Sequence, residues 1–139
     1  MHIAGIIAEY DPFHAGHAAH IAATRAAGAT HIAVVMSGNF TQRGKPALLP
    51  KQRRVAMALK CGADLLIELP LPWAMAPAEV FATGGVSLLQ ALGCVQVLSF
   101  GCECGDVASL QLVASAMDAP AYNAALRQAM QAGVSYAAA

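Results

Sequence analysis

Short, nearly continuous apolar runs alternate with helical segments along almost the whole chain of 139 residues. Strands that are apolar on both faces are typical of a parallel sheet covered by helices on both sides. We therefore expect an α/β fold with such a sheet, and one domain over residues 1–139 because no repeat or linker divides it. The expected strands are 3–8, 31–36, 64–69 and 95–100, and the expected helices are 16–27, 51–61, 78–92, 107–117 and 120–132.

A few residues mark where these elements start and stop. Asp106 is expected to cap the helix that begins at 107, and Pro120 suits the first turn of the last helix. Pro70 and Pro72 are expected to end the third strand.

The composition limits the classes of protein to which the chain can belong. Hydrophobic residues make up 58% of the chain and charged residues 12%, and much of the apolar content is alanine, which favours helices. No stretch approaches the roughly 18 uninterrupted apolar residues of a membrane span, and no signal peptide is evident. We therefore expect a cytoplasmic protein without a membrane partner, whose four cysteines stay reduced. Its oligomeric state is left open.

The formal net charge is zero, whereas a domain that neutralises many phosphates normally carries a basic excess. This argues against binding of nucleic acid by this segment alone. One basic cluster has two open interpretations, a solvated helix start or a phosphate or RNA contact: Arg43, Lys45, Lys51, Arg53 and Arg54. Cys102 and Cys104 lack zinc-finger spacing and a second pair of ligands, so we expect no metal site.

The first expected strand runs into a turn that places His14 and His17 around Gly16 at the start of a helix. The N-terminal end of a helix presents unpaired N–H groups and attracts anions. Imidazoles placed there add hydrogen-bond donors, and Gly16 leaves room for a ligand to approach the backbone. This arrangement predicts a nucleotide phosphate site.

Other unusual residues gather in the loops that come after the expected strands, at 9–17, 37–43, 68–73 and 101–104. In open α/β sheets, ligands bind beyond the carboxyl ends of the strands, where strand order reverses. We therefore expect the functional site at this edge. The polar loop after the second strand supplies the candidate phosphate or RNA contacts Ser37, Asn39 and Arg43.

Several ordered blocks resemble one known family. EYDPFHAGH at 9–17 resembles EYNPFHNGH, MSGNFTQRG at 36–44 resembles MSGxFxQRG, and FGCE at 100–103 resembles FGSE. AMALK at 56–60, GADL at 62–65 and IELP at 67–70 match further blocks. The family is the bacterial tRNA(Met) cytidine acetate ligase, which belongs to the HxGH nucleotidyltransferase superfamily. The resemblance implies a Rossmann-like, HxGH-type ATP-binding domain.

The resemblance also implies a reaction. Acetate attacks the α-phosphate of ATP, supplied with Mg²⁺, and the acetyl group of acetyl-AMP then passes to the wobble cytidine of elongator tRNA(Met), forming N4-acetylcytidine. His14 and His17 are the implied catalytic residues, with His17 at the α-phosphate. The implied ATP-binding residues are Ile7, Ala8, Glu9, Tyr10, Asp11, Pro12, Phe13, His14, Ala15, Gly16, His17, Ala18, Ala19, His20 and Gly101.

The chain also departs from the family. Asp11 and Ala15 replace two asparagines, and Cys102 replaces a serine. The family's later basic motif and tRNA-binding region are not found after these blocks, so the ATP-binding domain is expected to be truncated at its C-terminus. Two alternatives therefore stay open: a nucleotide-binding module without turnover, and another HxGH nucleotidyltransferase that makes a nucleotide-linked cofactor. His20, Glu68 and Trp73 also keep structural interpretations beside functional ones.

Overall fold

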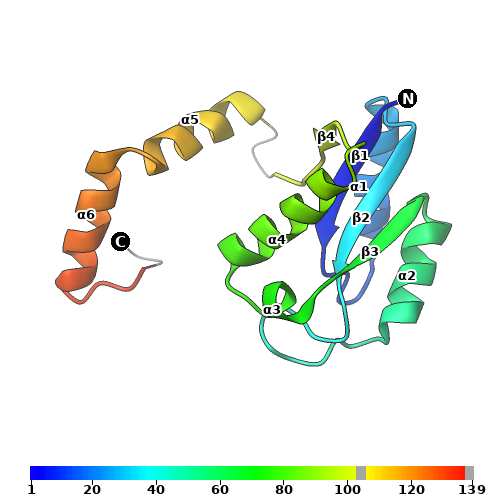
Figure 1. Ribbon diagram of the computed structural model, residues 1–139, viewed down its shortest axis with the longest axis horizontal. Coiled ribbons are helices and arrows are strands. Elements are labelled where there is room, and N and C mark those ends of the chain that lie inside the picture. Colours follow the sequence, from blue (N-terminus) through cyan, green and yellow to red (C-terminus); the bar gives the residue numbers. More distant parts are fainter. Residues whose placement is uncertain (103–105, 137–139) are drawn as a thin grey trace. The chain divides into compact units, whose positions relative to one another are not determined.

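The computed structural model describes residues 1–102 and 106–136. The chain folds as two compact units, Met1–Gly101 and Cys102–Ala139. The first unit contains the whole sheet, and the second contains two helices (Figure 1). The expectation of a single domain over 1–139 stays a prediction. Glu103 and Cys104, which belong to a family block and to the cysteine pair considered above, lie outside the described residues.

The predicted parallel sheet is confirmed. It has four strands in the order β3-β2-β1-β4, and every neighbouring pair is parallel. The strands are β1 (Ile3–Ala8), β2 (His31–Ser37), β3 (Leu65–Leu69) and β4 (Val97–Leu98). β4 is shorter than expected, although hydrogen bonds to β1 continue on both sides of it, from Gln96 N–H to the Ile3 carbonyl and from Ser99 N–H to the Gly5 carbonyl.

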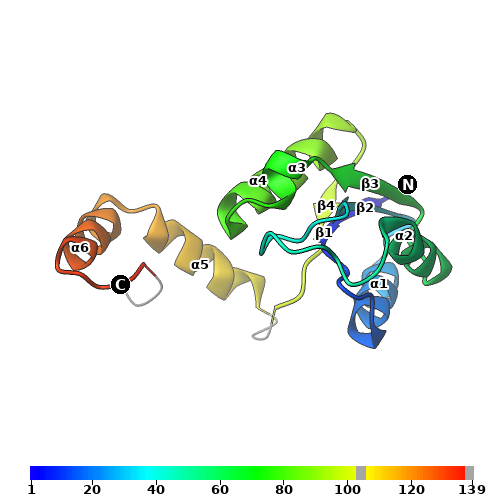
Figure 2. The same cartoon turned by 90° about the horizontal axis from the view of Figure 1, so that it is seen from below.

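Helices cover both faces of the sheet, as the sequence predicts (Figure 2). On one face Ile6 and Val34 pack against Ile21 of α1 and Ala58 of α2. On the other face Val35 packs with residues of α3 and α4. Successive residues of β2 are therefore buried on opposite faces. The four helices are α1 (Ala15–Ala26), α2 (Lys51–Lys60), α3 (Leu71–Ala74) and α4 (Ala78–Ala91).

Two adjacent glycines let α4 lie close to its neighbours. A Cβ on Gly85 would lie 2.7 Å from the side chain of Ile7, and one on Gly84 would lie 2.5 Å from the ring of Trp73. Trp73 therefore packs against α4 while 42% of it stays exposed, which favours the structural interpretation of this residue.

The short helix α3 was not predicted. Pro70 and Pro72 do end β3, but Pro70 is the N-cap of α3 and Pro72 lies in its first turn. Proline is tolerated there because the first helical N–H groups have no partner within the helix. The same residues that break a strand therefore start a helix.

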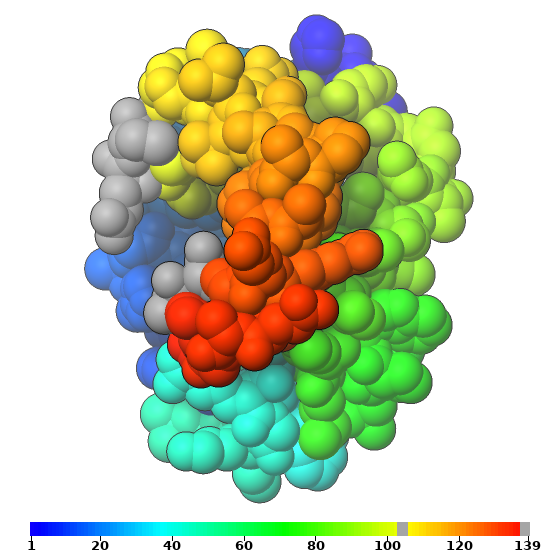
Figure 3. Space-filling model, turned by 90° about the vertical axis from the view of Figure 1, so that its left-hand side faces the viewer, coloured from blue at the N-terminus to red at the C-terminus, as the bar shows by residue number. Residues whose placement is uncertain are grey.

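The second unit contains α5 (Val107–Met117) and α6 (Pro120–Gln131), coloured from yellow to orange-red in Figure 3. The predicted cap is confirmed, since the Asp106 carboxylate accepts the N–H groups of Ala108 and Ser109. Hydrogen bonds from the Ser109 hydroxyl and these N–H groups lower the pKa of Asp106. No described residue of α5 or α6 is buried. None of the described helices combines the length and the apolar character that a membrane span requires.

A buried arginine joins the carboxyl ends of β1 and β2. Arg54 on α2 is fully buried, and its guanidinium donates to the carbonyls of Glu9 at 2.6 Å, Ser37 at 3.1 Å and Gly38. Its Nε donates to the carbonyl of Leu49 at 3.1 Å. Burial lowers the pKa of Arg54, and nearby carboxylates oppose that shift. The alternative of a solvated helix start is therefore wrong for this residue.

We expect Arg54→Met to lower the free energy of unfolding by about 3–5 kcal/mol, because four carbonyl oxygens lose their donor. Arg54→Lys should also be strongly destabilising, since an ammonium group cannot reproduce the planar fork. Exposed Arg53 provides the control, and Arg53→Met should change the value by no more than about 0.5 kcal/mol. Urea denaturation measures all three variants, and equal losses for Arg53→Met and Arg54→Met would contradict the assignment.

Candidate functional site

A cavity of about 530 Å³ lies beyond the carboxyl end of β1. β1 has β2 on one side and β4 on the other, so the strand order reverses at this point, which is where α/β sheets bind ligands. The cavity is lined by Ile6, Ile7, Ala8, Glu9, Tyr10, Asp11, Pro12, His14, His17, His20, Phe100 and Gly101.

Most of the residues that the resemblance implies for ATP binding therefore come together around one cavity. Phe13, Ala15, Gly16, Ala18 and Ala19 belong to the same segment but do not line it. Phe13 packs against the core instead.

Two lining residues, Ile6 and Phe100, were missed in the sequence. Each directly precedes an expected ATP-binding residue, Ile7 or Gly101. This position next to an expected site segment was the signal by which the sequence could have identified them.

The two histidines of the motif cap the start of α1. His14 is the N-cap, and its Nδ1 accepts the N–H of Gly16 at 3.1 Å. In return, Nδ1 of His17 accepts the N–H of His14 at 3.2 Å. The two rings stack with centroids 3.7 Å apart. The pair thus forms a reciprocal capping box made from imidazoles instead of the usual Ser or Thr with Glu or Gln.

This capping box determines which ring nitrogen carries the proton. A nitrogen that accepts an N–H carries no proton, so each neutral ring of His14 and His17 is protonated at Nε2. Each Nε2–H is then a donor in a residue that lines the cavity. Burial, followed by the proximity of His14 and His20, lowers the pKa of His17. The neutral form of His17 is therefore favoured.

Gly16 also has a structural reason to be glycine. A Cβ at this position would lie 3.0 Å from Cε1 of His14 and 3.1 Å from its Nδ1. The missing side chain therefore makes room for the His14 ring as it caps the helix.

Tyr10 packs its ring against the ring of His17 and supports it. Its φ of 52° lies in the left-handed region, which is unfavourable for a tyrosine. The ring is buried and packs edge-on against His17 and Phe13, with centroids 4.8 and 4.9 Å away. Its hydroxyl has no hydrogen-bond partner among the described residues. Burial, together with the charge of Cys61, raises the pKa of Tyr10 to about 12, so it stays neutral.

The acidic side chains of the motif hold the loop that comes after β2. The Glu9 carboxylate accepts the N–H of Gln42, and the Asp11 carboxylate accepts the N–H of Leu48 at 2.6 Å. One oxygen of each carboxylate is therefore already hydrogen-bonded to the backbone. The Asp11 departure from the family has a structural role here.

The held loop is a small hairpin. Thr41 N–H donates to the carbonyl of Lys45, Ala47 N–H donates to that of Asn39, and Arg43 lies exposed at the tip. Ser37 is fully buried, and its hydroxyl has no partner among the described residues. The candidate contacts Ser37, Asn39 and Arg43 do not line the cavity. Their binding roles stay predictions.

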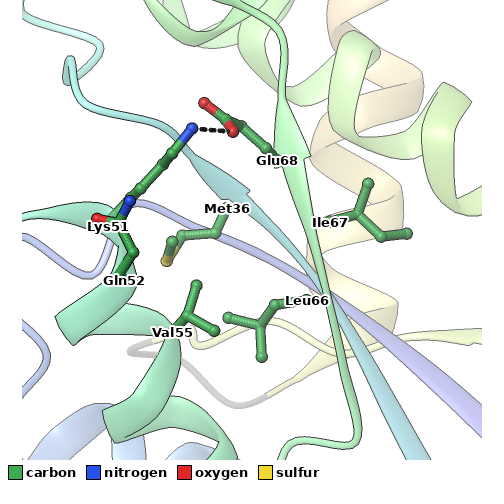
Figure 4. A pocket seen from close by; sticks show the side chains of 7 residues that line it. All are labelled: Met36, Lys51, Gln52, Val55, Leu66, Ile67 and Glu68. Atoms are coloured by element: carbon green, nitrogen blue, oxygen red, sulfur yellow. Dashed lines mark hydrogen bonds and ion pairs between the residues drawn. The ribbon is translucent and has the colours of Figure 1, made fainter.

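A second cavity of about 320 Å³ lies between α2 and β3 (Figure 4). Met36, Val55 and Leu66 supply its apolar lining, and at its rim Lys51 and Glu68 point toward one another. Nζ of Lys51 lies 2.5 Å from Oε2 of Glu68 in this ion pair. This pairing gives Glu68 a structural role. Of the basic cluster, Arg43, Lys45 and Arg53 remain exposed.

Within residues 1–102 and 106–136, no group of three or more His, Cys, Asp and Glu side chains is placed to hold a metal ion. The carboxylates of Glu9 and Asp11 are the acidic groups that line the first cavity.

Comparison with known proteins agrees with the resemblance found in the sequence. The chain is 49% identical to the tRNA(Met) cytidine acetate ligase of Syntrophotalea carbinolica and 46% identical to that of Acetivibrio thermocellus. Each alignment covers 100% of this chain and 34% of the relative. The chain therefore spans about a third of the length of these curated relatives.

A solved structure shares the fold. The crystal structure of Thermotoga maritima TmcAL bound with alpha-thio ATP superposes with a TM-score of 0.91 at 38% identity, covering 98% of this chain and 34% of that one. The apo structure of the same protein gives a TM-score of 0.90. The predicted Rossmann-like α/β fold is thereby confirmed. The family model for HIGH nucleotidyl transferases matches residues 1–139, and the chain belongs to that family.

Proposed function

We propose that this chain is the ATP-binding part of an enzyme that activates acetate as acetyl-AMP and transfers the acetyl group to the wobble cytidine of elongator tRNA(Met). The observation that carries the proposal is the cavity beyond β1, where His14 and His17 cap the same helix. The names of the relatives, and the ATP analogue bound to the Thermotoga maritima protein, support the choice of substrates.

In the proposed first step, a carboxylate oxygen of acetate attacks the α-phosphorus, and the bond from that phosphorus to the bridging oxygen breaks. Pyrophosphate leaves with the bond electrons. In the second step, the N4 amine of cytidine attacks the acetyl carbon, AMP leaves, and the amine loses a proton. The catalytic demand is mainly positioning and charge stabilisation.

The residues around the cavity are suited to that demand. The Nε2–H groups of His14 and His17 are donors, and the positive end of the helix dipole at the start of α1 favours an anion. We assign both histidines to the triphosphate, with His17 at the α-phosphate. Mg²⁺ would enter bound to the triphosphate, because this ion commonly uses substrate phosphates with few protein carboxylates.

Acetyl transfer and tRNA recognition are proposed for the whole protein, because the chain spans about a third of its relatives. We expect the complete protein to exchange labelled pyrophosphate into ATP only when acetate is present. Exchange without acetate would contradict acetate activation. ATP binding without any exchange would favour the alternative of a binding module. Acetate-independent activity with phosphopantetheine or nicotinamide mononucleotide would favour a cofactor-forming nucleotidyltransferase.

Variants of His17 separate its capping role from its contact with phosphate. His17→Ala should weaken ATP binding by about 10- to 100-fold, because it removes both the cap and a donor to a charged group. His17→Gln should preserve helix stability, since glutamine at this position completes a capping box. Isothermal titration calorimetry and thermal denaturation measure the two effects. ATP affinity unchanged in His17→Ala would contradict the proposed contact.

The lowered pKa values of His17 and His20 also predict a dependence of stability on pH. Below about pH 6.5 the unfolded chain binds protons that the folded chain does not, so acid favours unfolding. We expect the free energy of unfolding to fall between pH 7.5 and roughly 5.5, and to fall less in a His17→Gln, His20→Gln double variant.

Asp106→Asn provides the control for this measurement. The hydrogen bonds from Ser109 and Ala108 hold the pKa of Asp106 below its usual range, so its carboxyl stays ionised across the tested range. When urea denaturation is measured at each pH, the free energy of unfolding of this variant should therefore change with pH as steeply as that of the wild type. A double histidine variant that also keeps the full slope would contradict the assignment.

A further inference from the structure

β4 is a short edge strand that leads into one wall of the nucleotide cavity. It pairs with β1 at two positions, Val97 with Ala4 and Leu98 with Gly5. The chain then continues into Phe100 and Gly101, which line the cavity and are exposed. A short edge strand needs further contacts if the residues after it are to stay in place.

Ser99 supplies such contacts with α1. Its hydroxyl oxygen lies 2.9 Å from Nε2 of His20 and 2.7 Å from Oγ1 of Thr24. Thr24 Oγ1 also donates to the backbone carbonyl of His20 at 2.9 Å. His20 and Thr24 are four residues apart on α1 and therefore share one face of the helix. Thr24 is only 6% exposed, so its hydroxyl is shielded from water.

The number of protons that the two hydroxyl groups carry determines the direction of each of these hydrogen bonds. The single hydroxyl proton of Thr24 goes to the His20 carbonyl, so Ser99 must be the donor in its bond to Thr24. Ser99 then has only acceptor capacity left for His20. Nε2 of His20 therefore carries a proton and donates it to Ser99. The arrangement is consistent with the burial that lowers the pKa of His20.

The bond to Ser99 distinguishes His20 from the other two histidines of the cavity. In His14 and His17 Nδ1 accepts a backbone N–H, which leaves Nε2–H without a partner in these contacts. In His20 it is Nε2–H that is already engaged, with Ser99. His20 thus lines the cavity without offering this proton to a ligand.

We propose that Ser99 and Thr24 are positioning residues for the nucleotide: the bonds of Ser99 to Thr24 and to His20 hold the Phe100–Gly101 wall against α1. The proposal rests on the proposed ATP site. When the phosphates bind at the start of α1, the nucleoside occupies the part of the cavity beside Phe100 and Gly101. The Ser99 contacts therefore act on nucleoside binding, whereas the capping box of His14 and His17 acts on phosphate binding.

The test compares two probes on the complete chain, ATP and inorganic tripolyphosphate, by isothermal titration calorimetry. Ser99→Ala and Thr24→Val should each weaken ATP binding by about 2- to 10-fold, the usual effect of one lost hydrogen bond. Both should leave tripolyphosphate binding within about twofold of wild type. Thr24→Ser keeps the hydroxyl that Thr24→Val removes, so it should bind ATP as tightly as the wild type does. Ser87→Ala, which removes an exposed serine of α4, is the matched control.

A second readout reports on the His20 ring directly. In ¹⁵N NMR spectra of the wild-type chain at neutral pH, His20 should be protonated at Nε2 and unprotonated at Nδ1. Ser99→Ala should reduce that preference. A wild-type His20 protonated at Nδ1 would overturn the assigned hydrogen bonds.

The outcomes separate this proposal from the proposed function. Equal weakening of both probes, or no weakening of either, would overturn the positioning role while ATP binding by the wild type stands. A wild-type chain that does not bind ATP at all would overturn the ATP site itself, and with it the nucleotide role of Ser99 and Thr24.

Discussion

The arrangement of the site depends first on the guanidinium of Arg54. It binds carbonyl oxygens at the end of β1, at the end of β2 and just before α2, which are segments far apart in the sequence. A single planar group with five donors can satisfy all four acceptors, which no other side chain can do. These carbonyls would otherwise remain unpaired inside the protein at considerable cost. The relative placement of the two loops at the site therefore depends on one side chain on a third element.

The motif at 9–17 is mostly occupied with its own backbone and that of its neighbours. Glu9 and Asp11 hold the hairpin, and Tyr10 supports His17. Each of the two histidines uses Nδ1 to hold the helix start, which leaves its Nε2–H to donate to the proposed ligand. The spacing of the histidines is set by the capping geometry, because an N-cap and the third helical residue are three positions apart. In the proposed site, structure and ligand binding thus use opposite edges of the same rings.

Much of this could be predicted from the sequence. The apolar runs identified the sheet, and the glycine between two histidines identified the helix start, because both depend on local patterns. The burial of Arg54 could not be predicted, since its partners are backbone carbonyls that any residue carries. The contact of Ser99 with His20 joins positions 79 residues apart and leaves no periodic signal. Helix α3 was missed because a proline marks the end of a strand without specifying the structure of the next segment.

The bond from Leu48 to Asp11 has a consequence for how such a site can vary. The acceptor is Oδ1 of Asp11, and asparagine carries an equivalent Oδ1 oxygen at the same place. Exchange between the acid and the amide therefore preserves the anchor of the hairpin while it changes the charge beside the cavity by one unit. Evolution can therefore adjust the electrostatic potential that an anionic ligand meets at this position without rebuilding the loop. Aspartate and asparagine have the same shape here, but they differ in the electric field that they produce.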